Sequence, residues 1–338
     1  MNNHLAVNTI IAGCFFNETI INLEDQVFLN RPGGEVLYAA AGFNLLQKNA
    51  GLVSTISNDE SIEWINEFGN FPINFLGINK ASVHFDQKRF YANKKTGEVE
   101  TANPQKHFFK IGVSLPKYLL GYSSPQSGID KRNSPTFSSL KPTNIPEIFL
   151  QAHNLILCPI DYYTHSLIPP YFRSKTDGNV ILCASNGYMH PSFWYEIPAL
   201  IRGSAAFLTT EHQIRNLFLG KTDDIWDMTA YLANCGVEII SVFGKERSAF
   251  IYDGSSKNKI FIPFFPSKAI DLIGTYATFC GGFGAGFTTH FDPIRAGLMG
   301  VVTASINIEG STPLHTFRAL PELANARLEA LKSMITIV

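Results

Sequence analysis

Residues 271–283 have the sequence DLIGTYATFCGGF, and GAGF follows at 284–287. The apolar residues of this stretch have helical spacing, yet it holds five glycines. A glycine inside a helix costs about 1 kcal/mol relative to alanine. Such a density of glycine is expected where two helices approach closely or where the backbone lies against a ligand. Asp292 and Pro293 then begin another helix, because Asp caps free amides and Pro favours the first helical position.

Upstream of this stretch, apolar runs of strand length alternate with segments of helical period. The alternation predicts an α/β fold with one mostly parallel twisted sheet and helices on both faces. The predicted strands are 9–12, 53–56, 155–158, 180–183, 206–208 and 238–243, and the predicted helices are 39–46, 62–68, 211–219 and 224–234.

Two regions interrupt the alternation. Residues 83–111 hold short apolar runs separated by a turn, which predicts an antiparallel flap laid on the main sheet. Residues 122–146 are rich in Ser, Pro, Gly and Lys and have no apolar period, which predicts a long loop. The strands expected in the flap are 83–85, 89–91 and 107–109.

Composition and charge exclude several classes of protein. Hydrophobic residues make up 45% of the 338 residues and charged residues only 16%, which argues against disorder and against a coiled coil. Lys and Arg number 27 and Asp and Glu 28, so no basic excess points to a nucleic-acid partner. No apolar run approaches the roughly 20 residues that cross a bilayer, so no membrane partner is expected.

The cysteines and the first residues of the chain bear on the compartment. The five cysteines are far apart, odd in number and mostly set in apolar strings, and the first residues carry no basic signal-peptide region. This pattern predicts buried thiols in a reducing, cytoplasmic environment and no disulfide framework. Neither the cysteines nor the nine histidines have ligand spacing, so no metal site is predicted. The cysteines are Cys14, Cys158, Cys183, Cys235 and Cys280.

Residues 271–283 resemble the C-terminal signature of the ribokinase/PfkB carbohydrate kinases, Asp-Thr-Xaa-Gly-Ala-Gly-Asp-Xaa-Phe-Xaa-Gly-Gly-Phe. The N-terminal signature of that family, a Gly-Gly followed four residues later by Asn, is partly matched at 31–40. Gly244 stands where the family has the first glycine of a turn near the nucleotide. The matched positions of the C-terminal signature are Asp271, Gly274, Phe279, Gly281, Gly282 and Phe283.

The resemblance extends in order over nearly the whole chain. It implies a single ribokinase-like domain of three layers over residues 1–338, with a small β-lid formed by 15–30 and 83–111. It implies a sugar or nucleoside as small-molecule ligand and ATP with Mg²⁺ as cofactors, and it allows a homodimer through the lid. The implied substrate-binding residues are Glu18, Gly33, Gly34 and Tyr38, and the implied nucleotide-binding residues are Gly244, Asp271 and Gly274, with Gly274 and Thr275 as anion-hole candidates.

Several positions depart from the family in the residues that carry its chemistry. The Asp that serves the family as general base is Ala277 here, and a methyl group accepts no proton. Tyr276 replaces the second glycine of the anion hole and cannot offer the same close backbone approach. Tyr38 replaces the substrate-binding Asn. The Asn-Xaa-Xaa-Glu associated with Mg²⁺ and phosphate is matched only by Thr210 to Gln213.

The residues that differ from the family are those that carry its chemistry, whereas the glycines that pack helices together are retained. The favoured hypothesis is that the protein retains the fold and that its phosphotransfer is altered or lost. Such a protein binds a sugar- or nucleoside-like ligand or a protein partner, and its ATP and Mg²⁺ sites lack the usual ligands. The alternative is an active ATP-dependent kinase of a sugar or nucleoside hydroxyl. Phosphoryl transfer depends mainly on positioning and charge stabilisation, so loss of the base alone does not abolish it.

Structural roles remain open for several of these residues. Tyr38 either stacks on a ligand ring or fills the pocket. Glu18 either holds substrate hydroxyls or is a solvated loop carboxylate. Asp271 either orients the anion hole or helps to hold a metal, or it caps the next turn as a strand-end carboxylate, which is the favoured role. Asp161 follows a strand end, where α/β proteins place ligand groups, but it also suits a helix cap. Residues 261–266 either line a nucleotide pocket or pack beneath residues 271–283.

Overall fold

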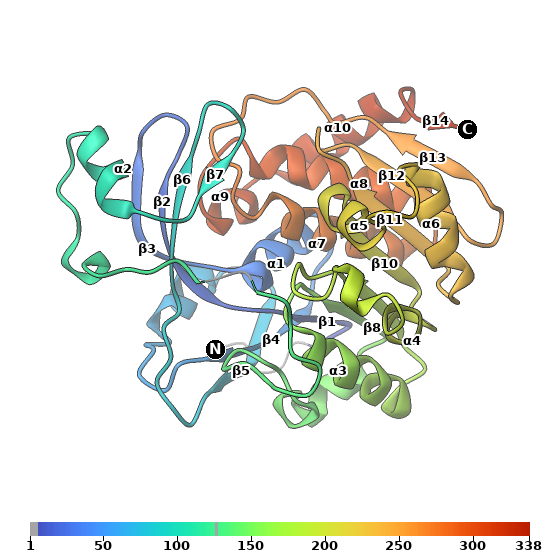
Figure 1. Ribbon diagram of the computed structural model, residues 1–338, viewed down its shortest axis with the longest axis horizontal. Helices are drawn as coiled ribbons and strands as arrows, with labels where there is room; N and C mark the ends of the chain where they lie inside the picture. Colours follow the sequence, from blue (N-terminus) through green and yellow to red (C-terminus); the bar gives the residue numbers. More distant parts are fainter. Residues whose placement is uncertain (1–5, 126–127) are drawn as a thin grey trace.

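The computed structural model describes residues 6–125 and 128–338. A ten-stranded sheet in the order β14-β13-β12-β11-β10-β9-β8-β1-β4-β5 forms the centre of this part of the chain (Figure 1). The seven strands from β11 to β5 are parallel, and β12, β13 and β14 continue the sheet in antiparallel fashion. The strands are β1 (Thr9–Ala12), β4 (Ala50–Ile56), β5 (Ile73–Lys80), β8 (Asn154–Leu157), β9 (Asn179–Cys183), β10 (Ala206–Thr210), β11 (Ile239–Phe243), β12 (Ala249–Asp253), β13 (Lys259–Ile262) and β14 (Thr336–Ile337).

Helices cover both faces of this sheet, which confirms the predicted three-layer α/β architecture. One apolar core lies between the sheet and α1 (Glu35–Leu46), α7 (Thr275–His290), α8 (Pro293–Asn307), α9 (Pro313–Phe317) and α10 (Pro321–Lys332). The other core lies between the opposite face and α3 (Tyr162–Lys175), α4 (Ile197–Ile201), α5 (Glu211–Leu217) and α6 (Ile225–Asn234). Successive strand residues alternate between the two cores, as the pleat requires: Ile156 faces the first, whereas Leu155 and Leu157 face the second.

The glycines of α7 are explained by close helix packing. A Cβ added to Gly281 would collide with the backbone of Ala39 in α1, and one added to Gly282 would collide with Thr303 in α8. Helix α7 is therefore held between α1 and α8 at a separation that only glycine permits. Asp292 begins α8 as predicted, and its Oδ1 accepts a hydrogen bond of 2.8 Å from the Ile294 amide.

A second, smaller sheet lies beside the main one (Figure 1, left), at the residues expected to form the lid. It has the order β3-β2-β6-β7. Strands β6 and β7 pair antiparallel within residues 83–111, as the predicted flap requires. Strands β2 and β3 also pair antiparallel, and β2 joins β6 in parallel. The chain passes through β4 and β5 of the main sheet before it reaches β6. The strands are β2 (Phe16–Ile21), β3 (Val27–Gly33), β6 (Lys88–Asn93) and β7 (Val99–Glu100).

The end of the flap is helical instead of extended. Residues 107–109 belong to helix α2 (Pro104–Lys110), which begins with Pro104 at its first turn, and residues 83–85 form no strand. Phe108 packs with Phe90 in an apolar cluster on the face of the lid that is turned away from α1 and α7. Residues 104–122 thus cover the outer face of the lid from within the same chain.

Other expectations can be compared element by element. The segment predicted as a helix at 62–68 is a 3₁₀ helix, Glu63–Phe68. The predicted loop at 122–146 is irregular apart from a short 3₁₀ turn, Pro142–Asn144, although residues 126–127 lie outside the described residues. All five cysteines are free, and four of them are buried. Within residues 6–125 and 128–338, no helix has the length and apolar character needed to cross a membrane.

Candidate functional site

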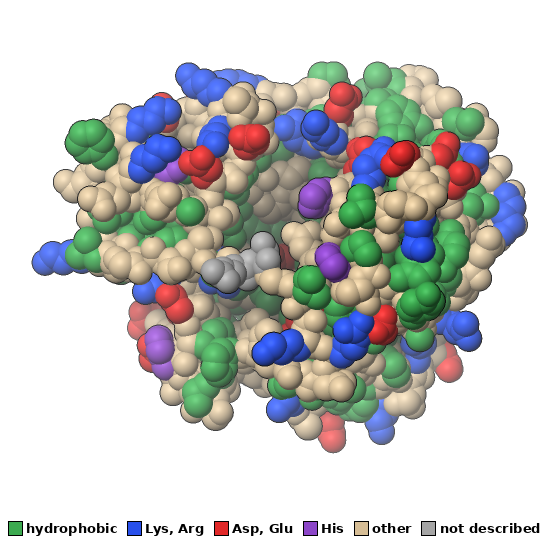
Figure 2. Space-filling view, in the orientation of Figure 1, with side chains coloured by type: hydrophobic (Ala, Val, Ile, Leu, Met, Phe, Trp, Pro, Cys, Tyr) green, Lys and Arg blue, Asp and Glu red, His purple; other side chains and the backbone are tan. Residues whose placement is uncertain are grey.

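A cleft of about 820 Å³ lies between the lid and the carboxyl ends of the central strands, the usual place for a ligand in a parallel α/β sheet. Figure 2 shows it as the hollow at the centre of the face in view. Its walls come from the lid, from the residues that follow β1, β8 and β9, and from the first turns of α1 and α7. Among the predicted site residues, Glu18, Gly34, Tyr38, Gly274 and Thr275 line this cleft.

Glu18 reaches from lid strand β2 to the start of α1. It is 2% exposed, so it is not a solvated loop carboxylate. Its Oε1 accepts a hydrogen bond of 2.8 Å from the Gly34 amide, and its Oε2 accepts one of 3.0 Å from the Tyr38 hydroxyl. Burial raises the pKa of Glu18 to about 8, although both hydrogen bonds act to lower it. Gly33 is required behind this carboxyl group, because a Cβ there would overlap it.

Tyr38 fills the space between α1 and the start of α7. Its side chain is 2% exposed and belongs to an apolar cluster that includes Ile273 and Ala277. Its ring lies against Gly274 so closely that a Cβ on that glycine would overlap the ring. Of the two roles left open by the sequence, this burial and this contact favour the pocket-filling one.

The first turn of α7 differs from an open anion site. The Thr275 hydroxyl donates to the Leu272 carbonyl at 2.7 Å. The Tyr276 ring turns toward the core, 6.0 Å from the Phe243 ring, and its hydroxyl is buried without a hydrogen-bond partner among the described residues. The backbone of this turn lines the cleft, but Tyr38 covers Gly274 at its start.

Comparisons with known proteins identify the architecture. No protein-family model matches the sequence, and no curated protein matches it. Solved structures do match over 96% of this chain and 99% of theirs: Arabidopsis thaliana ribokinase complexed with ribose and ATP has a TM-score of 0.67 at 12% identity, Methanocaldococcus jannaschii nucleoside kinase 0.64 at 18%, and Thermotoga maritima ribokinase 0.64 at 17%. The chain has the ribokinase fold. Identities this low establish the fold, and the chemistry has to be argued from the residues of the cleft.

Two predicted nucleotide-binding residues of this ribokinase fold do not line the cleft. Asp271 is 1% exposed, and its Oδ1 accepts hydrogen bonds of 3.0 Å from Asn93 in the lid and from the Ile273 amide. Burial raises the pKa of Asp271 to about 6. Gly244 lies in the turn between β11 and β12, where its amide donates to the Ser248 carbonyl at 2.8 Å. Both contacts stabilise the scaffold around the cleft.

The segment matched to the family's metal-associated motif uses its polar groups to cap helix α5. The Thr210 hydroxyl accepts from the Gln213 amide at 3.2 Å, and Gln213 Oε1 accepts from the Thr210 amide at 2.8 Å. This reciprocal pair is a capping box at the start of α5. Asp161 likewise caps α3, since it accepts from the Thr164 amide at 2.8 Å. In the part of the chain that the structure describes, no group of three His, Cys, Asp or Glu residues could hold a metal ion.

Three charged residues of the cleft were not predicted from the sequence. Glu35, Arg89 and Asp130 all line it. Glu35 directly follows Gly34 within the N-terminal signature, but it is not one of the positions that carry the resemblance. Arg89 and Asp130 lie in segments interpreted as a flap and as a loop. Only their three-dimensional placement brings them to the cleft.

Proposed function

We propose that this chain is a ribokinase-like protein that binds a small polar molecule and has lost phosphoryl transfer. The observation that carries the proposal is the position of Tyr38. Its hydroxyl donates to Glu18, and its ring lies on Gly274 and beside Ala277. These are the positions that the family resemblance assigns to the sugar, the anion hole and the general base.

The contacts of Tyr38 leave no place for an acceptor hydroxyl at this point. Both Glu18 oxygens already accept a hydrogen bond, one from the Gly34 amide and one from Tyr38. Ala277 offers no proton acceptor, and loss of a general base lowers rates by about 10²–10⁴-fold. Because Tyr38 fills the acceptor position as well, restoring the base alone would leave the site closed.

The remaining walls of the cleft do not fit ATP with Mg²⁺. Mg²⁺ takes carboxylate oxygens and keeps several waters, but Glu211 at the matched segment is engaged with Arg215 at 2.8 Å and with the Lys245 amide at 3.0 Å. Thr210 and Gln213 bind each other. A triphosphate would also meet the acidic side chains of the cleft. These observations support a protein without the phosphotransfer chemistry of the kinases that share its fold.

The test is ATP consumption by the wild-type protein with Mg²⁺ and a panel that includes ribose, inosine and adenosine. We expect turnover at background for every compound. A matched variant, Tyr38→Asn with Ala277→Asp, reopens the acceptor position and restores a base. Substrate-dependent ATP consumption by the wild type would contradict the proposal, because Tyr38 would then have to leave its pocket during turnover.

A further inference from the structure

The cleft that Tyr38 leaves open is polar, and two opposite charges stand in it without pairing. Glu35 is the first residue of α1, and Arg89 belongs to lid strand β6. Both line the cleft, and Arg89 acts to lower the pKa of Glu35, so each lies within the other's field. Nevertheless, no ion pair within 4.0 Å joins them in the described residues.

Glu35 has a buried oxygen that the protein does not satisfy. Its Oε2 is inaccessible to solvent and has no hydrogen-bond partner among the described residues. A buried acceptor without a donor destabilises the protein, and more so when it is charged. Burial raises the pKa of Glu35 to about 7. The helix dipole favours an acidic residue in the first turn, but that attraction supplies no donor to Oε2.

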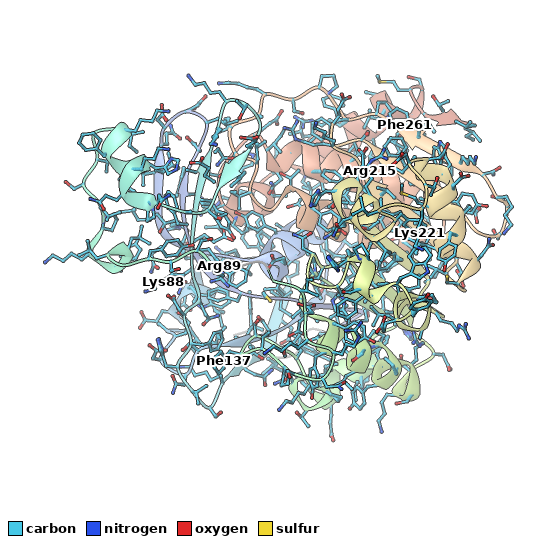
Figure 3. All side chains as sticks on the ribbon, viewed as in Figure 1. Lys88, Arg89, Phe137, Arg215, Lys221 and Phe261 are labelled. Carbon is cyan, nitrogen blue, oxygen red and sulfur yellow. The ribbon has the colours of Figure 1, made fainter. Side chains whose placement is uncertain are left out.

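Arg89 is held in place while most of its donors stay unused. Its guanidinium lies 3.9 Å above the Phe16 ring, and its Nη1 donates to the Lys88 carbonyl at 2.8 Å. A guanidinium carries five N–H donors in a fixed plane, so the remaining ones are available to a ligand. Both Arg89 and its neighbour Lys88 extend from the lid side of the molecule (Figure 3).

The other polar groups of the cleft suit hydroxyl groups. Ser185, Asn186, Thr136 and Ser138 also line the cleft. The Ser185 and Thr136 hydroxyls donate to the Ile160 carbonyl and to Asp161, at 2.6 and 2.9 Å, so their oxygens remain as acceptors for ligand hydroxyl groups. Asp130 adds a further carboxyl group, of which Oδ2 accepts from the Tyr162 amide at 2.8 Å. Acidic side chains therefore outnumber the one guanidinium of the cleft, which favours a ligand that brings a cationic group together with an anionic one.

We propose that the cleft binds a small polyhydroxylated amino acid, whose ammonium group donates to Glu35 while its carboxylate accepts from Arg89. This ligand class rests on the proposed function, because Tyr38 excludes the ligand from the position beside Glu18 and Ala277. An ammonium group placed against the partly exposed Glu35 side chain would offset its negative charge. The bound ligand would also bridge the two opposite charges that the protein keeps apart.

Four acyclic six-carbon compounds test the two charges separately. D-Glucosaminate carries ammonium and carboxylate, D-gluconate carboxylate only, D-glucamine ammonium only, and D-sorbitol neither. Calorimetric titration and the shift in melting temperature at pH 7.5 measure binding. We expect D-glucosaminate to bind at least tenfold more tightly than the other three compounds, because only it makes both charge-assisted hydrogen bonds.

Two variants that each remove one charge separate the contributions. Glu35→Gln should weaken D-glucosaminate and D-glucamine about tenfold or more and leave D-gluconate unchanged, whereas Arg89→Gln should weaken D-glucosaminate and D-gluconate and leave D-glucamine unchanged. Lys88→Gln, on the same strand, and Glu60→Gln, which carries a half-buried carboxyl outside the cleft, are the matched controls and should not affect binding. Melting temperatures without ligand verify that each variant is folded.

Three results would overturn this ligand class: no binding of any of the four compounds, equal binding of D-glucosaminate and D-sorbitol, or an unchanged preference in Glu35→Gln. ATP consumption measured with the same compounds keeps the two proposals apart. Binding of D-glucosaminate accompanied by its phosphorylation would refute the loss of phosphoryl transfer and retain the ligand class. Absence of both would refute the ligand class alone.

Discussion

The two ends of helix α7 differ in what holds them. In the middle and toward the C-terminal end, Gly281 and Gly282 are fixed by contacts with Ala39 and Thr303 on the neighbouring helices. At the N-terminal end, Tyr276 and Ala277 replace the residues that the resemblance assigns to catalysis. Packing constrains the first region in this chain, because a side chain at either glycine would collide with a neighbouring helix. The second region faces the cleft, and its residues are not fixed by such close helix contacts.

The largest effect on stability is expected from a substitution at Gly281, where α7 packs against α1. Gly281→Ala would place a methyl group on the Ala39 backbone, which cannot move without displacing α1. Overpacking costs about 1–3 kcal/mol, and a backbone obstacle puts this site at the upper limit. We expect the free energy of unfolding in urea to fall by about 3 kcal/mol.

Gly69→Ala is the matched control for the packed end. Gly69 has an ordinary backbone conformation, with φ of −63°, and the nearest atom to an added Cβ is the Asn66 oxygen at 3.5 Å. Its substitution should change stability by less than about 0.5 kcal/mol, as for most surface positions. Equal effects at Gly281 and Gly69 would mean that the glycines of α7 do not hold the helices together.

Glu18, which binds Tyr38 beside the N-terminal end of α7, should make the stability of the protein depend on pH. Its pKa is about 8 in the folded protein, above the ordinary value of 4.5, so the folded state binds the proton more tightly than the unfolded state does. Stability from this group is therefore present at low pH and is lost as the pH rises from about 4.5 through 8. Between pH 6 and 8 the loss amounts to about 2 kcal/mol.

Glu18→Gln is the measurement that isolates this group. Glutamine keeps an acceptor for Gly34 and donates to the Tyr38 oxygen, and it does not titrate. The decline in the free energy of unfolding between pH 6 and 8 should become shallower, while Glu35, with a pKa of about 7, maintains part of it. An unchanged slope in Glu18→Gln would mean that this carboxyl group is ionised in the folded protein.

A smaller effect is expected when the Tyr38 hydroxyl is removed. Tyr38→Phe keeps the ring against Gly274 but leaves Glu18 Oε2 buried without its donor. An unpaired buried polar group costs about 1–3 kcal/mol, and protonation of Glu18 at neutral pH should keep the loss near 1 kcal/mol. Thermal unfolding at pH 6.5 measures it. A more stable variant would show that the hydrogen bond is strained.

The sequence predicted the layers of this fold better than its site. Buried strands such as β8 and β9 are short apolar runs between turn residues, so their pattern is local and can be recognised. The sequence predicts a strand at 107–109 because His107 and Phe108 suit both structures, whereas Pro104 favours the first turn of a helix and begins α2. Tyr38 had two open roles because its contact with Gly274 joins residues far apart in the chain. Glu35 and Arg89 line the same cleft only because the folded chain places lid strand β6 beside the start of α1.

Restoring the general base alone should have the smallest effect of all on activity. Ala277→Asp would place a carboxylate at the first turn of α7, where the helix dipole favours a negative charge. Its neighbours in the structure, however, are Tyr38, Ile20 and Ile273, an apolar cluster in which the Tyr38 hydroxyl is already engaged with Glu18. The new carboxylate would have no proton to accept, and groups that act as a unit return little when one is repaired. We therefore expect ATP consumption to stay at background in Ala277→Asp, with the wild type assayed under identical Mg²⁺. A rise of two orders of magnitude with any sugar or nucleoside would mean that only the base was missing, and that both ends of α7 still serve a kinase.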